Sequence, residues 1–362
     1  MIRPKLVHFI SIQSDDYIHI RASMTYSHQA KFEVFEEIKK NFKDFVPTKP
    51  IQSLGLLSSN VFRIKVVGLN QNDQVCLMKQ FDSDPFGNFN FKILKPKDEN
   101  DLKLKIFEIK SHPGLELLIG SFIPTKIKIP KKILITDFDK TLVDTRYSTI
   151  KELYLSLRNP IQYFPEVPSS MTLVHDYLKQ DFSPFVVSAS PHFYENAIRD
   201  WLYKRQIFTG NIFLKDYRNI FSLFEGELST KDLKSQGFYK FDTIVNILLM
   251  TGVPDDLVLI GDGFESDTLI YLTIAAILVG KYDPWMLWNS VKTQEAFKLT
   301  NNQNVRFLTK LNQLKHLGLS RTPPKLKIYI RCKQHMIEGL EKQVFKLDYA
   351  NQLKYLVNYY VG

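Results

Sequence analysis

Residues 133–142 read ILITDFDKTL, and this stretch decides the fold that the sequence predicts. Its first four residues favour a short buried strand, and two carboxylates, Asp137 and Asp139, follow directly. In open α/β sheets the carboxyl ends of the strands are where ligands bind. Two carboxylates this close repel each other unless a cation offsets them. The stretch therefore favours a metal site over the alternative of an Asp-rich turn or helix cap.

The chain after Lys131 repeats this pattern of short apolar runs separated by amphipathic segments. The alternation predicts a parallel sheet with crossover helices, and hence an α/β fold. The expected strands are 133–136, 185–188, 211–214 and 257–260, and the clearest expected helices are 194–204 and 241–250.

The first 125 residues instead alternate apolar and polar side chains with period two, which is typical of β strands. We expect strands at 6–12, 17–22, 61–67, 75–79 and 89–93, with a helix at 29–45. The sequence therefore predicts a smaller β-rich accessory domain at 1–125, followed by the α/β domain at 126–362.

A second acidic stretch follows the strand expected at 257–260. The chain continues there as GDGFESD, in which two glycines allow a tight turn. Asp262 and Asp267 of this stretch could complete an oxygen-only Mg²⁺ site with Asp137, because a hard cation prefers carboxylate ligands. Gly-Asp turns after strands are common, so this stretch alone is weaker evidence than residues 133–142.

A serine and a lysine could supply an anion site beside these acids. Ser188 ends the strand expected at 185–188, and its hydroxyl and the free amides before the next helix suit a phosphate. A serine in this position also caps helices. Lys240, at the start of helix 241–250, could add a positive charge to the same phosphate, and a solvated surface lysine is the alternative.

The order of these segments resembles the haloacid-dehalogenase-like (HAD-like) phosphohydrolase superfamily. Its four motifs are Asp-x-Asp-x-Thr, a strand ending in Ser, a Lys, and Gly-Asp-x₄-Asp, and each has a match in this sequence. The resemblance implies a Rossmannoid three-layer sandwich around the parallel sheet. It also implies that Asp137 is the nucleophile, forming an aspartyl-phosphate, and that Asp139 is the general acid and base.

The same resemblance implies roles for the remaining polar residues. Ser188 and Lys240 would hold the phosphate. The implied Mg²⁺ ligands are the carboxylates of Asp137 and Asp262, the backbone carbonyl of Asp139, and Asp267, which would support or join that shell.

Shorter segments are similar to the catalytic domain of phosphatidate phosphatases of the fungal actin-patch type. They are SASP at 188–191, LKDY at 214–217, GDGFESDTLIY at 261–271 and KIYIR at 327–331. Two departures stand out: Lys140 replaces a third acid, and about 276–324 is an expected insertion, mostly helical. The resemblance implies a lipid phosphate such as phosphatidate as substrate.

The spacing of the motifs and the distribution of charge along the chain indicate which substrates and surfaces the protein could bind. Little chain is left around Ser188 for a cap over the site, and an open site suits a large or membrane-bound phosphate ester. The net charge is +10, and residues 301–362 hold eleven Lys and Arg against three acids, a net charge of +8. This basic region could meet an anionic membrane surface, nucleic acid or an acidic protein, or simply be solvated.

No targeting or membrane-spanning segment is expected. The start of the chain lacks a continuous apolar run, and the longest mostly apolar stretch, 269–280, has 12 residues, well short of the roughly 20 needed to span a bilayer. Two cysteines exclude a disulfide framework. We expect a cytoplasmic protein, peripheral at a membrane if its substrate is a lipid. A phosphatase of protein or nucleic-acid phosphates and a catalytically silent HAD-like binding module are the alternatives.

Overall fold

The computed structural model describes residues 3–27, 61–96, 101–144, 164–216, 236–297, 299–319 and 321–361, and all structural statements concern these residues. The helix expected at 29–45 lies outside them. The remaining expected strands are all present; most are longer than the sequence indicated, and those expected at 61–67 and 211–214 are shifted by one or two residues.

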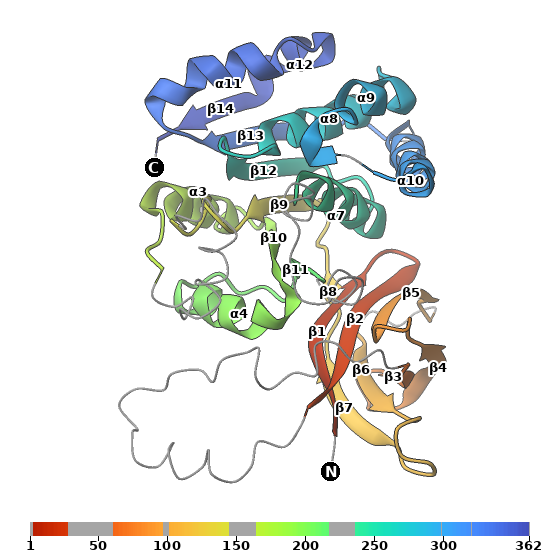
Figure 1. Ribbon diagram of the computed structural model, residues 1–362. Helices are drawn as coiled ribbons and strands as arrows, with labels where there is room; N and C mark the ends of the chain where they lie inside the picture. The colour runs from red at the N-terminus through yellow and green to blue at the C-terminus, as the bar shows by residue number, and fades with distance from the viewer. Residues whose placement is uncertain are drawn as a thin grey trace, which may run out of the picture.

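A six-stranded parallel sheet holds the acidic stretches (Figure 1). Its order is β11-β10-β9-β12-β13-β14, so β9, which contains the apolar start of the stretch 133–142, lies inside the sheet. The strands are β9 (Lys132–Asp137), β10 (Ser183–Pro191), β11 (Ile212–Lys215), β12 (Asp256–Asp262), β13 (Lys325–Arg331) and β14 (Val357–Tyr360). The prediction of a parallel α/β sheet is confirmed, and β14 was not predicted.

Helices cover both faces of this sheet, which explains why β9 is apolar at successive positions. Ile133 and Ile135 face one core, formed with α7 (Gln236–Thr251), α8 (Asp267–Val279), α9 (Pro284–Val291), α10 (Asn301–Leu319), α11 (Ile337–Val344) and α12 (Asp348–Gln352). Leu134 faces the other core, formed with α3 (Pro168–Leu178) and α4 (Glu195–Lys204).

Most of residues 276–324, the segment expected as an insertion, is helical. Residue 276 lies within α8, because residues 267–279 form one helix that is apolar on nearly every side and almost wholly buried. The helices that follow are α9 and α10, and the chain then returns to the sheet as β13. None of the described helices is long and apolar enough to cross a membrane.

The preceding part of the chain is β-rich, as predicted. Two four-stranded sheets, β5-β2-β1-β8 and β4-β3-β6-β7, pack on a shared apolar core. Their strands are β1 (Arg3–Gln13), β2 (Tyr17–Ser27), β3 (Arg63–Leu69), β4 (Val75–Asp82), β5 (Asn88–Leu94), β6 (Lys103–Glu108), β7 (Leu117–Phe122) and β8 (Thr125–Lys126). The last three were not predicted.

Strand β1 joins the two parts of the structure. Phe9 points into the core of the β-rich part, whereas Ile10 and Ile12 belong to the same core as Ile133 and Phe213 of the parallel sheet. Because side chains alternate along a strand, one face of β1 serves each part.

Candidate active site

The parallel sheet brings the two acidic stretches together at the carboxyl ends of its strands. Strands β9 and β12 pair directly, with Ile260 opposite Thr136, so Asp137 and Asp262 follow at the ends of neighbouring strands. Asp267 opens α8, and its Oδ2 accepts a hydrogen bond of 3.2 Å from the Asp262 amide. Three acids that are distant in sequence thereby share one buried place.

Asp137, Asp262 and Asp267 can each direct one carboxylate oxygen into a common space, with these oxygens within 4.8 Å of one another. All three side chains are buried. Burial raises the pKa of Asp137 well above its usual value and that of Asp262 to about 8. Among the described residues, Asp262 Oδ2 accepts no hydrogen bond, and Asp137 Oδ1 has the Lys240 ammonium 3.1 Å away. Three carboxylates that share one ammonium form an oxygen-only set that fits a hard divalent cation.

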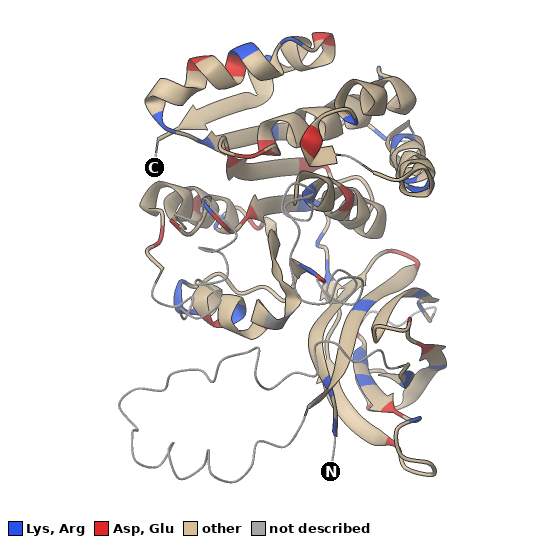
Figure 2. Ribbon diagram, viewed as in Figure 1, with Lys and Arg blue, Asp and Glu red and all other residues tan. Residues whose placement is uncertain are grey.

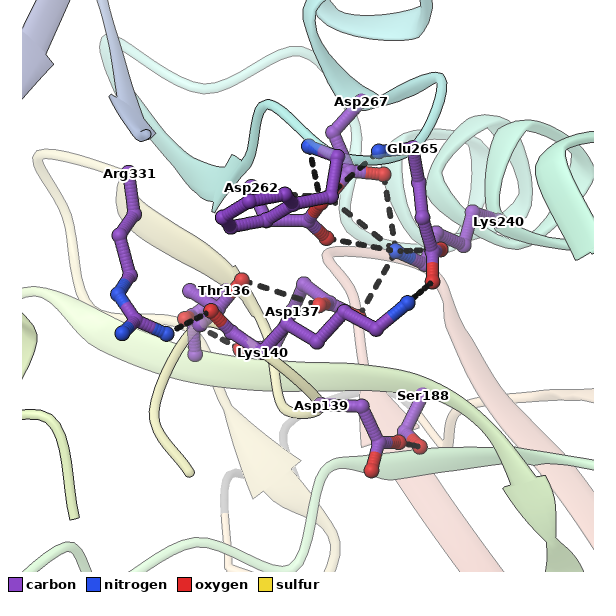
Figure 3. A network of polar contacts seen from close by, with 12 residues as sticks. Thr136, Asp137, Asp139, Lys140, Ser188, Lys240, Asp262, Glu265, Asp267 and Arg331 are labelled. Atoms are coloured by element: carbon purple, nitrogen blue, oxygen red, sulfur yellow. Dashed lines mark hydrogen bonds and ion pairs between the residues drawn. The ribbon is translucent and has the colours of Figure 1, made fainter. Parts of the chain in front are cut away.

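Lys240 supplies the positive charge that this cluster has in the structure (Figure 3). Its Nζ lies 2.9 Å from Asp267 Oδ1, 3.1 Å from Asp137 Oδ1 and 3.8 Å from Asp262 Oδ2. Burial opposes the charged ammonium, but the carboxylates, Asp137 foremost, raise the pKa of Lys240 well above its usual value. The residue lies in the second turn of α7 and is buried, so the surface-lysine alternative is wrong.

Glu265 is a further member of the cluster that the sequence reasoning did not single out. Its Oε2 lies 3.0 Å from Lys240 Nζ and its Oε1 lies 3.2 Å from Lys140 Nζ. Burial would raise the pKa of Glu265, but Lys240 and Lys140 lower it to about 2. The signal was present in GDGFESD, although nothing local indicates that a lysine after β9 meets this glutamate.

Asp139 points away from the acidic cluster and toward the end of β10 (Figure 3). Its Oδ2 accepts hydrogen bonds from Ser188 Oγ at 2.7 Å and Ser190 Oγ at 2.9 Å. Burial raises the pKa of Asp139, while the two serine hydroxyls act in the opposite direction. Ser188 thus lies at the site but donates to Asp139 here, and Ser190 is a partner that the sequence reasoning missed.

Two contacts fix the backbone and side chains after β9. Thr141 Oγ1 donates to Asp137 Oδ2 at 3.0 Å, which sets the rotation of that carboxylate. Arg331, at the end of β13, donates through Nη1 to the Lys140 carbonyl at 2.6 Å. Lys140 itself has a left-handed backbone, with φ of 59°. The loop is therefore held by one contact within itself and by one from β13.

The segment after Ser190 is anchored to the β-rich part. His192 Nδ1 lies 3.2 Å from Asp216 Oδ1, and Asn88 of β5 donates to Asp216 Oδ2 at 2.7 Å. The final residue of the LKDY segment, Tyr217, lies outside the described residues. The end of β10, which carries both serines, is thus tied to a strand from the β-rich part.

Residues 133–281 match the family model described as "Phosphatidate phosphatase APP1, catalytic domain". The match covers less than half of the chain. It confirms the resemblance to phosphatidate phosphatase catalytic domains, and the family it names is an enzyme family, a class of phosphoric monoester hydrolase. Every acid of the buried cluster and Lys240 lie inside the matched segment.

Whole-protein comparisons are much weaker. No curated protein matches the chain. Among solved structures, a Parabacteroides merdae beta-glucuronidase with glycerol in its active site is 9% identical over 94% of this chain and 34% of its own, with a TM-score of 0.25. A glycosyl hydrolase family 2 member from Bacteroides cellulosilyticus is 9% identical over 99% of this chain and 44% of its own, with a TM-score of 0.24.

A Bacteroides uniformis beta-glucuronidase is also 9% identical, over 92% of this chain and 34% of its own, with a TM-score of 0.25. The chain thus spans less than half the length of these structures. Scores this low carry no argument about fold or chemistry.

Proposed function

We propose that the chain is a Mg²⁺-dependent phosphomonoester hydrolase of the HAD-like type, with a lipid phosphate such as phosphatidate as its substrate. One observation carries the proposal: the segment that matches a phosphatidate phosphatase catalytic domain contains the whole cluster of buried acids and Lys240. A β-rich accessory domain at 1–125 and a three-layer catalytic domain at 126–362 complete the proposed organisation.

Asp137 is the proposed nucleophile. One of its carboxylate oxygens attacks phosphorus, and the bond from phosphorus to the leaving alkoxide oxygen breaks as the aspartyl-phosphate forms. The hydrogen bond from Thr141 to Asp137 Oδ2 supports this role, because it holds the carboxylate in one rotation.

Asp139 is the proposed general acid and base. It gives its proton to the departing alkoxide, and then takes a proton from the water that attacks the aspartyl-phosphate and releases phosphate. Its contacts with Ser188 and Ser190 support this role, since they hold the carboxyl away from the acidic cluster. Ser188 and Lys240 would hold the phosphate oxygens during both steps.

Mg²⁺ would be held by Asp137, Asp262 and Asp267 with the backbone carbonyl of Asp139. When bound, the cation offsets the charge of the carboxylates and draws electron density from the phosphate oxygens. In this structure the Lys240 ammonium compensates part of the negative charge of the carboxylates. Its flexible four-carbon stem allows the ammonium to turn toward a bound phosphate.

The lipid substrate implies work at an anionic membrane surface, and a cytoplasmic, peripheral location. Helix α10 supports this, because it carries Arg306, Lys310 and Lys315 and no acid, whereas α11 carries both signs (Figure 2). One of the three, Lys310, is paired with Asp242 at 2.6 Å, whereas Arg306, one turn before it, is exposed and can face an anionic surface.

The test is phosphate release from phosphatidate vesicles and from a soluble aryl phosphate, with and without Mg²⁺, in the wild type and Asp137→Asn. We expect activity on both that requires Mg²⁺, vanishes in the variant and strongly favours vesicles. The matched control is Asp176→Asn, which removes an exposed carboxylate of α3 and should leave activity unchanged.

Other outcomes separate the parts of the proposal. Activity on the aryl phosphate alone keeps the chemistry and contradicts the lipid substrate. Release of protein-bound or nucleic-acid phosphate in preference to lipid favours the rival substrates. If no ester releases phosphate, the hypothesis of an active phosphatase is contradicted, and the catalytically silent HAD-like binding module becomes the better hypothesis.

A further inference from the structure

A cavity of about 760 Å³ lies at the amino ends of the parallel strands, away from the acidic cluster at their carboxyl ends. Its walls are the β1–β2 hairpin, strand β5, the amino end of β9 and the carboxyl ends of α7 and α10. The volume is in the range of small-molecule sites. None of the proposed catalytic residues lines it.

One wall of this cavity carries positive charge in excess. His19 and Arg21 are two apart on β2, so they share one face, and Lys92 of β5 lies directly opposite His19. None of these three makes an ion pair with an acid in the described part of the chain. Arg21 and Lys92 are the charged residues of this wall, and a bound anion would offset their charge.

The other cations of the cavity already have partners. Lys131 Nζ contacts Asp15 Oδ2 at 2.9 Å and the Thr251 carbonyl at 3.3 Å. Arg321 donates to the Val253 carbonyl at 3.3 Å. The charge available to a ligand therefore lies on the β2 and β5 wall, where burial and Lys92 lower the pKa of His19.

The facing wall is mixed. Its apolar side chains come from the last turns of α7 and α10 and the turn that follows α7: Leu249, Met250, Val253 and Leu317. Its polar side chains include Asn246, Gln313 and His316 of the same helices. A ligand that fills the cavity would place an anionic group on the first wall and an apolar group on the second.

We propose that this cavity is a second ligand site, which binds a phosphomonoester attached to an apolar group. The phosphate would contact Arg21 and Lys92, with His19 beside it, because an arginine fork and a lysine suit phosphate oxygens. The site does not depend on the proposed catalytic function, since it shares no residue with it.

The experiment is calorimetric binding to the full chain carrying Asp137→Asn, in EDTA, with two probes. One is dihexanoyl phosphatidate below its critical micelle concentration, and the other is inorganic phosphate. We expect saturable binding of both, tighter for the lipid, with shifts of the His19 ring resonances in NMR spectra. Arg21→Gln with Lys92→Gln should weaken both by about tenfold or more, because two charge-assisted hydrogen bonds are lost.

Two further variants separate this site from the acidic cluster. Arg21→Lys keeps the charge but loses the guanidinium fork, and should retain more affinity than Arg21→Gln. Ser188→Ala changes only the proposed catalytic site and should leave unchanged the binding that the Arg21 and Lys92 changes remove. Binding that is lost in Ser188→Ala, or that is indifferent to the Arg21 and Lys92 changes, overturns the proposal. Equal affinities for phosphate and the lipid would overturn the apolar part of it.

Discussion

The balance of charge around Lys240 dominates the chemistry at the scale of single residues. One buried ammonium contacts the carboxylates of Asp137, Glu265 and Asp267, and Asp262 lies slightly farther away. Breaking a buried ion pair by removing one partner leaves an uncompensated charge, which costs far more than the pair is worth. The lysine and the acids should therefore respond to substitution in opposite ways.

Lys240→Met should destabilise the metal-free protein by about 3–5 kcal/mol, because the buried carboxylates lose the buried ammonium that contacts Asp137 and Asp267. Mg²⁺ should restore part of this loss by binding the same acids. Urea denaturation in EDTA and in Mg²⁺ measures both effects. Lys179→Met, which removes an exposed ion pair, is the control and should change stability by less than about 0.5 kcal/mol. Wild-type stability of Lys240→Met in EDTA would contradict this account.

Asp262→Asn should stabilise the metal-free protein increasingly as the pH rises from about 4 to 8. Burial raises the pKa of Asp262 to about 8, above its unfolded value of 3.8, so its stabilising contribution is full below 3.8 and is lost as the pH rises through 8. Asparagine does not ionise and avoids this loss. Denaturation of both proteins in EDTA at pH 5 and pH 8 measures it. A difference between them that stays constant with pH, or one matched by Asp176→Asn, would rule it out.

At the scale of elements, the turn from β12 into α8 depends on Gly261. A Cβ there would lie 2.5 Å from Asp267 Oδ2 and 2.7 Å from the Tyr271 hydroxyl oxygen, so the cluster would have to shift. Gly261→Ala should cost about 1–3 kcal/mol and reduce Mg²⁺ binding. Thermal unfolding with and without Mg²⁺ measures both.

Gly339 of α11 is the matched control, since a Cβ there meets no atom within 4 Å. Gly339→Ala should raise stability by roughly 0.5–1 kcal/mol through helix propensity. An equal effect of the two substitutions would show that the crowding at Gly261 has no consequence.

The sequence predicts those elements whose signal is local. Apolar runs such as 133–136 identify strands, and the Asp and Gly residues after them identify the site. Strand β14 was missed because Val357–Tyr360 is four residues long and only partly buried. The contact of Lys140 with Glu265 was missed because it joins loops 125 residues apart, which only the pairing of β9 with β12 brings together.

At the scale of the whole molecule, the β-rich part packs against the part that carries the acidic cluster. Ile10 and Ile12 of β1 complete the core beneath α7, and Asn88 anchors Asp216, which contacts His192 just after β10. The first strand of the chain thus supports the helix that carries Lys240. Sequence patterning could not show this, since period two identifies the buried face of a strand and not the element that covers it.

Ile12→Ala should therefore loosen α7, whereas Ile93→Ala should not. Both isoleucines are buried, and either change should cost roughly 2–5 kcal/mol, but Ile93 belongs to the core between the two β-rich sheets. Hydrogen exchange followed by mass spectrometry reports on α7 directly. We expect the amides of 236–251 to exchange faster in Ile12→Ala and at the wild-type rate in Ile93→Ala. Equal acceleration in both would mean that the two cores unfold as one unit, and no acceleration in either would mean that β1 does not support the helix of Lys240.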